Sequence, residues 1–207
     1  MRITLPTFRI AAADLLQHVS RVQYRGKPLY FGCDATNRYD APTQAYGVLY
    51  LGCDLSTALM ESVFHKHQWD KDLNRSIAMA EVRSRLVRAV GVLQDLSLAD
   101  LTAEGVMAGY FGLNLEQLIS RDYRYTQQIS AQAHAEMTDD DQPRFDGIRY
   151  PSRNNYPATS IALFERARDK VRVFDDIDLV DHLDWPGFVA RYRIGIVPDS
   201  GRAMRND

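Results

Sequence analysis

Residues 33–67 constrain the fold more than any other stretch, because they place a loop, a buried strand and a helix in direct succession. Residues 37–40 lie among turn-forming residues, which predicts a loop. Residues 48–51 are a short apolar run bounded by glycines, which is typical of a buried strand. Asp54 can cap a helix through His67, with apolar residues four positions apart along one face.

Three polar side chains belong to this succession. Arg38 lies in the loop, Tyr50 near the end of the strand, and Glu61 about two turns into the helix, off its apolar stripe. A loop, a strand end and a helix that follow one another can bring such side chains together. The stretch therefore suggests a cleft that these three residues share.

Length and charge limit the classes of protein to which the chain can belong. With 207 residues, 45% hydrophobic and 25% charged, it has the composition of one globular domain, which we expect to span residues 1–207. Its 25 basic and 27 acidic side chains give a net charge of −2, which does not favour binding to nucleic acid.

The sequence shows no apolar run long enough to cross a membrane and no export signal. We therefore expect a cytoplasmic protein that binds no membrane. Cys33 and Cys53 are then interpreted as reduced thiols in the core.

The remaining chain alternates between helical and strand patterns, which predicts a single mixed α/β (α+β) domain with a central sheet flanked by helices. Helices are predicted over residues 11–19, over 97–106 from a capping-box pattern, and over 185–192. Strands are predicted over 86–93, 146–150, 159–164 and 171–174, and the tail over 198–207 is expected to be frayed.

Standard motifs for nucleotides, metals and hydrolases do not occur. There is no Walker loop, no GxGxxG and no zinc spacing, and Ser152 is not in a GxSxG elbow. His65 and His67 at a helix end suit the helix dipole better than a metal ion. We expect no metal and no bound cofactor.

The residues left as candidates are Arg21, Arg38, Tyr50, Glu61 and Ser152. Each has an ordinary structural explanation as a surface arginine, a core aromatic, a solvated glutamate or a turn serine. Together they suit an anionic ligand with a labile sugar bond. Arginines hold phosphates, a tyrosine stacks on a flat ring, and a carboxylate stabilises a cationic sugar transition state.

Six ordered segments of residues 19–174 resemble the RES-domain family, which is named for its arginine, glutamate and serine. By position Arg38, Glu61 and Ser152 match these three residues, Tyr50 matches a strand-end tyrosine, and Arg21 an additional arginine. Asn37 replaces the usual glycine before the arginine, and Tyr39 keeps the aromatic that follows it. The segments are PLYFG (28–32), NRYDAP (37–42), YGVLYLG (46–52), STALMES (56–62), RYPSRN (149–154) and ALFE (162–165).

The resemblance implies a fold similar to ADP-ribosyltransferases and an enzyme that consumes NAD as its substrate, by hydrolysis or phosphorolysis. It implies that Arg21 and Arg38 hold the pyrophosphate, that Tyr39 and Tyr50 bind the substrate, and that Tyr50 stacks on nicotinamide. Glu61 would stabilise the ribose cation, and Ser152 would position the ribose or the nicotinamide side.

Many such proteins are toxins whose active site is covered by an Xre-like antitoxin. Two alternatives stay open, ADP-ribose transfer to a protein and a non-catalytic module that binds a nucleotide or partner.

Overall fold

The computed structural model describes residues 4–65 and 75–199, which are built around one curled, mixed sheet. The strands are β1 (Thr7–Ile10), β2 (Leu15–Arg21), β3 (Val48–Gly52), β4 (Arg75–Ala78), β5 (Arg85–Val92), β6 (Leu96–Asp100), β7 (Gly147–Pro151), β8 (Thr159–Phe164), β9 (Val171–Asp178) and β10 (Ile194–Val197). The α-helices are α1 (Leu55–Glu61), α2 (Met79–Arg83), α3 (Leu115–Ile119), α4 (Arg124–Ala135) and α5 (Trp185–Arg191). Shorter turns are η1 (Val22–Tyr24), the π-helical η2 (Val106–Tyr110), η3 (Glu165–Lys170) and η4 (Leu179–Asp181).

Eight strands form the main sheet in the order β1-β6-β7-β8-β3-β2-β5-β9, and β10 pairs with β4 separately. Within the main sheet β6 and β7 run parallel, and the other neighbouring strands run antiparallel. The mixed α/β fold with a central sheet and flanking helices is confirmed.

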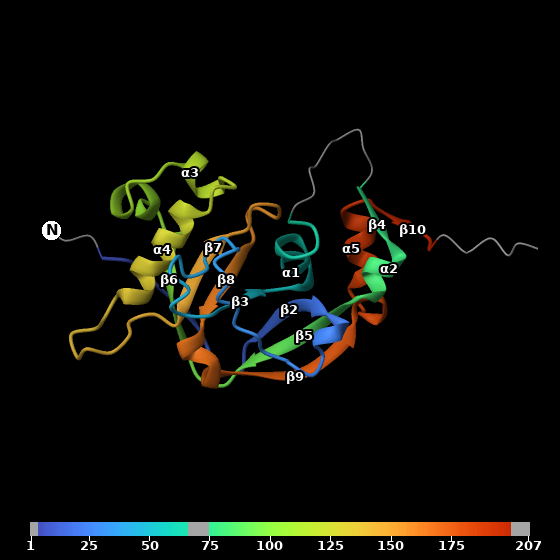
Figure 1. Ribbon diagram of the computed structural model, residues 1–207, viewed down its shortest axis with the longest axis horizontal. Helices are drawn as coiled ribbons and strands as arrows, with labels where there is room; N and C mark the ends of the chain where they lie inside the picture. Colours follow the sequence, from blue (N-terminus) through green and yellow to red (C-terminus); the bar gives the residue numbers. More distant parts are fainter. Residues whose placement is uncertain (1–3, 66–74, 200–207) are drawn as a thin grey trace, which may run out of the picture.

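Helices cover the sheet at three places (Figure 1). Helices α3 and α4 lie beside β7 and β8, α1 lies over β2 and β3, and α2 and α5 lie at the opposite side from α4. Three buried clusters result. One packs α4 against β7 and β8, one fills the inside of the curl, and one joins α1 and α5 to β2 and β5.

The predicted strand and helix around Tyr50 and Glu61 are confirmed, although the helix is shorter than predicted. Asp54 caps α1 by accepting a hydrogen bond from the Thr57 amide at 2.7 Å. The helix ends at Glu61. At Ser62 the amide bonds to the Leu59 carbonyl at 3.3 Å, and the hydroxyl donates to the Ala58 carbonyl at 2.6 Å. Glu61 is therefore the last helical residue, and His67 lies outside the described residues.

The prediction of a helix over residues 11–19 is wrong, because Leu15–Arg21 forms β2. Leu16 packs inside the curl, whereas Val19 packs under α1 on the other face of the strand. A strand that is buried on both faces shows apolar residues three positions apart, which imitates the spacing of a helix.

The helix predicted over residues 97–106 is also wrong, because Leu96–Asp100 forms β6 between β1 and β7. The Ser97 amide donates to Asp146 at 2.8 Å, so the expected capping box does not form. The interpretation of the cysteines as core thiols is wrong as well, since Cys33 and Cys53 are both free and exposed.

Two further predictions concern a membrane-spanning helix and the C-terminal tail. Over residues 4–65 and 75–199, no helix has the length and apolar character needed to cross a membrane. Most of the tail predicted over residues 198–207 lies outside the described residues.

Candidate active site

The main sheet is nearly divided between β2 and β3. These strands pair at one position among the described residues, Gln17 with Gly52, whereas β3 pairs with β8 over all five positions from Val48 to Gly52. At the next residue the His18 side chain, and not the backbone, contacts β3. Its Nδ1 atom lies 2.9 Å from the Tyr50 carbonyl oxygen. Because a carbonyl only accepts, Nδ1 must carry the proton, and Nε2 is then an acceptor.

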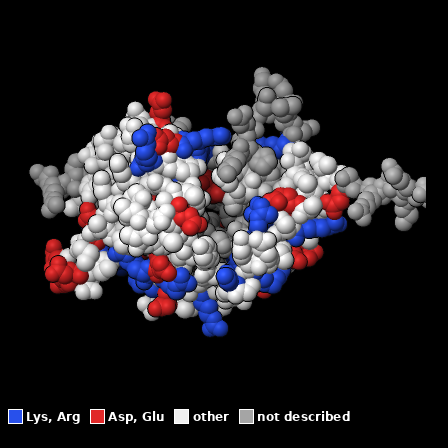
Figure 2. Space-filling model, viewed as in Figure 1, with Lys and Arg blue, Asp and Glu red and all other residues white. Residues whose placement is uncertain are grey.

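A cleft opens where the two strands separate. A small cavity of about 50 Å³ is lined by Tyr50, Glu61 and Tyr150, among others. A larger cavity of about 650 Å³ is lined by Arg21, Lys27 and Arg88, among others. His18 and Val19 line both cavities, so the cleft runs from Glu61 to Arg21. Figure 2 shows a hollow at the centre of the face turned to the viewer, between the parts that carry α4 and α5 in Figure 1.

Glu61 and Ser152 are brought together at one end of this cleft. Glu61 Oε1 accepts hydrogen bonds from the Ser152 hydroxyl at 2.7 Å and from the Arg153 amide at 3.0 Å. The Ser152 oxygen in turn accepts from the Asn155 amide at 3.1 Å. These donors orient the carboxylate. Ser152 is only 1% exposed, so it orients Glu61 from the protein interior.

Arg38 lies behind the tyrosines and does not appear in the lining of either cavity. Its guanidinium is 5.3 and 5.4 Å from the ring centres of Tyr39 and Tyr150, and Nη2 donates to the Leu118 carbonyl at 2.7 Å. Within the described chain its buried Nε and Nη1 atoms have no acceptor. Burial opposes the charge, but the tyrosines and Glu61 outweigh it, so the pKa of Arg38 is raised. This setting separates Arg38 from the cation-lined cavity that contains Arg21, the other arginine expected to hold the pyrophosphate.

Of the two predicted substrate-binding tyrosines, Tyr50 reaches the cleft and Tyr39 does not. Tyr39 is 0% exposed and packs on Tyr150 with ring centres 4.5 Å apart, so it supports its neighbours without presenting a face to a ligand. The Tyr50 hydroxyl donates to Asp40 Oδ1 at 2.9 Å and accepts from the Tyr39 amide at 2.8 Å. Burial raises the pKa of Tyr50 well above its usual value, and its ring orientation is fixed.

Four residues of the site were missed from the sequence: His18, Asp40, Arg88 and Tyr150. Asp40 is fully buried, and its Oδ2 accepts from the Thr36 and Asn37 amides at 3.0 and 2.8 Å, which shapes the loop before Tyr50. Arg88 stands in the apolar run of β5, and such a charge within a buried strand was a usable signal. The described residues contain no group of three or more His, Cys, Asp or Glu that could hold a metal.

The family model described as RES domain matches residues 8–186, which is most of the chain. The chain belongs to the RES domain family. This family is generally linked to NAD-related toxin function. No curated protein matches this RES domain.

The stability of this RES domain should fall when the pH drops below about 6.5. Burial is the main cause that lowers the pKa of His18 from 6.5 to about 4, and Arg88 lowers it further, against the Tyr50 hydrogen bond. Between these values the unfolded chain binds a proton that the folded chain does not. The free energy of unfolding should therefore fall by up to about 1.4 kcal/mol per pH unit from this residue.

Denaturant titrations between pH 7 and 4 would measure this fall. In His18→Asn, the amide can replace Nδ1–H as the donor to Tyr50, but it does not titrate. An equal slope for this variant and the original protein would contradict the assignment to His18.

Proposed function

We propose that this RES domain cleaves the nicotinamide–ribose bond of NAD. The observation that carries the proposal is the Glu61 carboxylate, held by Ser152 and Arg153 at the end of a cleft whose other part is lined by cations. A dinucleotide has a ribose that becomes cationic during cleavage and a diphosphate that is anionic. The cleft offers each of these parts an opposite charge.

The chemistry assigned to the residues is a dissociative displacement at the ribose. The C1′–N1 bond breaks and nicotinamide leaves with the bonding electrons, so positive charge develops on the ribose ring. The Glu61 carboxylate stabilises this charge, and Ser152 keeps the carboxylate in place. Water then attacks C1′ and releases a proton to the solvent, or an unprotonated phosphate oxygen attacks C1′ directly. In this proposal the Tyr50 ring contacts nicotinamide, and Arg38 supports Glu61 from behind the tyrosines.

Release of nicotinamide from NAD by the purified protein should be measured with and without inorganic phosphate. Release in both conditions with ADP-ribose as product indicates hydrolysis, whereas phosphate-dependent release indicates phosphorolysis. Absence of release from folded protein in both conditions would refute NAD cleavage by this chain alone. Isotopically labelled NAD added to cell lysate separates transfer to a protein from both reactions, because the label then appears on a protein band.

Expression in a bacterial host tests whether the activity is toxic. If cleavage is fast, the cellular NAD level should collapse and growth should stop. We propose that a partner protein with an Xre-like DNA-binding domain covers the cleft, and its co-expression should then restore growth. NAD turnover without growth arrest would contradict the role as a toxin while leaving the enzymatic proposal in place.

A further inference from the structure

Arg88 is the least exposed arginine that lines the cleft, and it is held by neutral groups. It is 1% exposed and lies opposite His18 in the β2–β5 pairing. Its Nη1 donates to the Ser20 hydroxyl at 2.8 Å, and its Nη2 donates to the Tyr24 carbonyl at 2.7 Å. Its buried Nε has no acceptor among residues 4–65 and 75–199.

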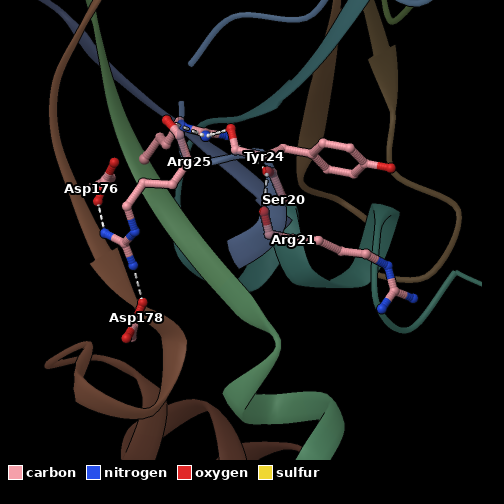
Figure 3. Close-up of polar contacts among 7 residues, drawn as sticks. Ser20, Arg21, Tyr24, Arg25, Asp176 and Asp178 are labelled. Atoms are coloured by element: carbon pink, nitrogen blue, oxygen red, sulfur yellow. Dashed lines mark hydrogen bonds and ion pairs between the residues drawn. The ribbon is translucent and has the colours of Figure 1, made fainter. Parts of the chain in front are cut away.

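Three nearby carboxylates, Asp176, Asp178 and Glu81, are engaged with other arginines. Arg25 bonds to both Asp176 and Asp178, and Glu81 pairs with Arg85 and, at 3.5 Å, with Arg21. Figure 3 shows the side chains of Arg21 and Arg25 leaving the chain in opposite directions, with Arg25 turned toward the two aspartates.

Arg88 itself forms no ion pair with a carboxylate in the described part of the chain. Burial is the main cause that lowers its pKa, the charge of Asp176 opposes this effect, and Arg25 adds to it. A buried charge that no carboxylate contacts directly is unfavourable, so such a group often marks a place where an anion binds.

The cavity beside Arg88 has the charge that an anion requires. Among the described residues, its lining contains four basic side chains, Arg21, Lys27, Arg85 and Arg88, and one acidic side chain, Asp34. The neutral His18 separates these cations from Glu61, which lies at the other end of the cleft. An elongated ligand can therefore place an anionic part near Arg88 and a cationic centre near Glu61.

We propose that Arg88 is the buried anchor of a diphosphate subsite, which binds the pyrophosphate of the dinucleotide together with Arg21 and Lys27. This inference rests on the proposed function and transfers the pyrophosphate contact from Arg38 to Arg88. The guanidinium is already oriented by Ser20 and Tyr24, so little side-chain entropy is lost when a phosphate oxygen binds.

Calorimetry with ADP-ribose tests the subsite without any turnover. Arg88→Gln should weaken ADP-ribose binding about 10- to 100-fold, because a charge-assisted hydrogen bond is lost. Arg83→Gln is the matched control, since it removes the same charge from a side chain that is 62% exposed and does not appear in the cavity lining. Equal affinity in a folded Arg88→Gln protein and the original protein would overturn the inference.

Comparison of two ligands separates recognition of the diphosphate from a general structural role. The original protein should bind ADP-ribose at least about tenfold more tightly than adenosine, which lacks the phosphates. In Arg88→Gln this preference should shrink, whereas a merely structural defect would weaken both ligands equally. Lys27→Gln changes an exposed side chain, so it should reduce the preference without a risk to folding. No preference in the original protein would also overturn the inference.

These outcomes remain distinct from a failure of the proposed reaction. ADP-ribose bound through Arg88 without nicotinamide release would keep the subsite and refute the enzyme. Nicotinamide release with binding that is independent of Arg88 would keep the enzyme and refute the subsite.

Discussion

Glu61→Gln should lower the rate of nicotinamide release by about a hundredfold or more, with little change in stability. The amide oxygen of glutamine can still accept from the Ser152 hydroxyl and the Arg153 amide, which now hold Glu61 at 2.7 and 3.0 Å. The substitution therefore removes the negative charge and keeps these contacts. Because the charge is needed only as the ribose becomes cationic, kcat should fall much more than the affinity for NAD.

Single-turnover assays together with thermal unfolding would test this prediction. Glu104→Gln is the matched control, because Glu104 is exposed and does not line the cleft. Ser152→Ala should show a smaller loss, since the Arg153 amide continues to orient the carboxylate. Undiminished release from a folded Glu61→Gln protein would rule out the assigned mechanism.

Gly52→Ala should damage both stability and activity. A Cβ atom at this position would lie 2.5 Å from the Ala58 nitrogen and 2.9 Å from its Cα, so α1 would have to move away from β3. Such overpacking costs about 1–3 kcal/mol. The displacement would also move Glu61 at the end of α1, so nicotinamide release should fall together with the melting temperature.

Gly187→Ala makes the same substitution at a position with free space, so its effect on stability should be the opposite. Gly187 lies within α5, and a Cβ atom there would have no neighbour within 4 Å. Alanine is the better helix former, so the free energy of unfolding should rise by about 0.5–1 kcal/mol with activity unchanged. Denaturant titration of both variants measures the difference, and equal stability of the two would contradict the close packing of α1 on β3.

The local elements around the site were predictable from the sequence, because their signals are local. The glycine-bounded run of β3 and the Asp54 cap of α1 depend on neighbouring residues alone. The connection between Glu61 and Ser152 spans 91 positions, and only the order of the family segments pointed to it.

The pairing between distant strands was not predictable in the same way. Because β2 is buried on both faces, its pattern imitates a helix, which concealed His18 and its position opposite Arg88. How deeply a side chain is buried cannot be read from a single sequence either. Arg38 and Tyr39 matched the family pattern, yet both are buried behind the cleft, at 5% and 0% exposure.

The near-division of the sheet has a mechanical consequence. In the described part of the chain, one backbone pair, Gln17 with Gly52, and one imidazole hydrogen bond join β2 to β3, while α1 packs across both strands. A dinucleotide that contacts Glu61 and Arg88 would add a further link across this joint. Occupancy of the cleft and rigidity of the whole domain should therefore rise together, and amide hydrogen exchange in β2 would report the binding of ligand.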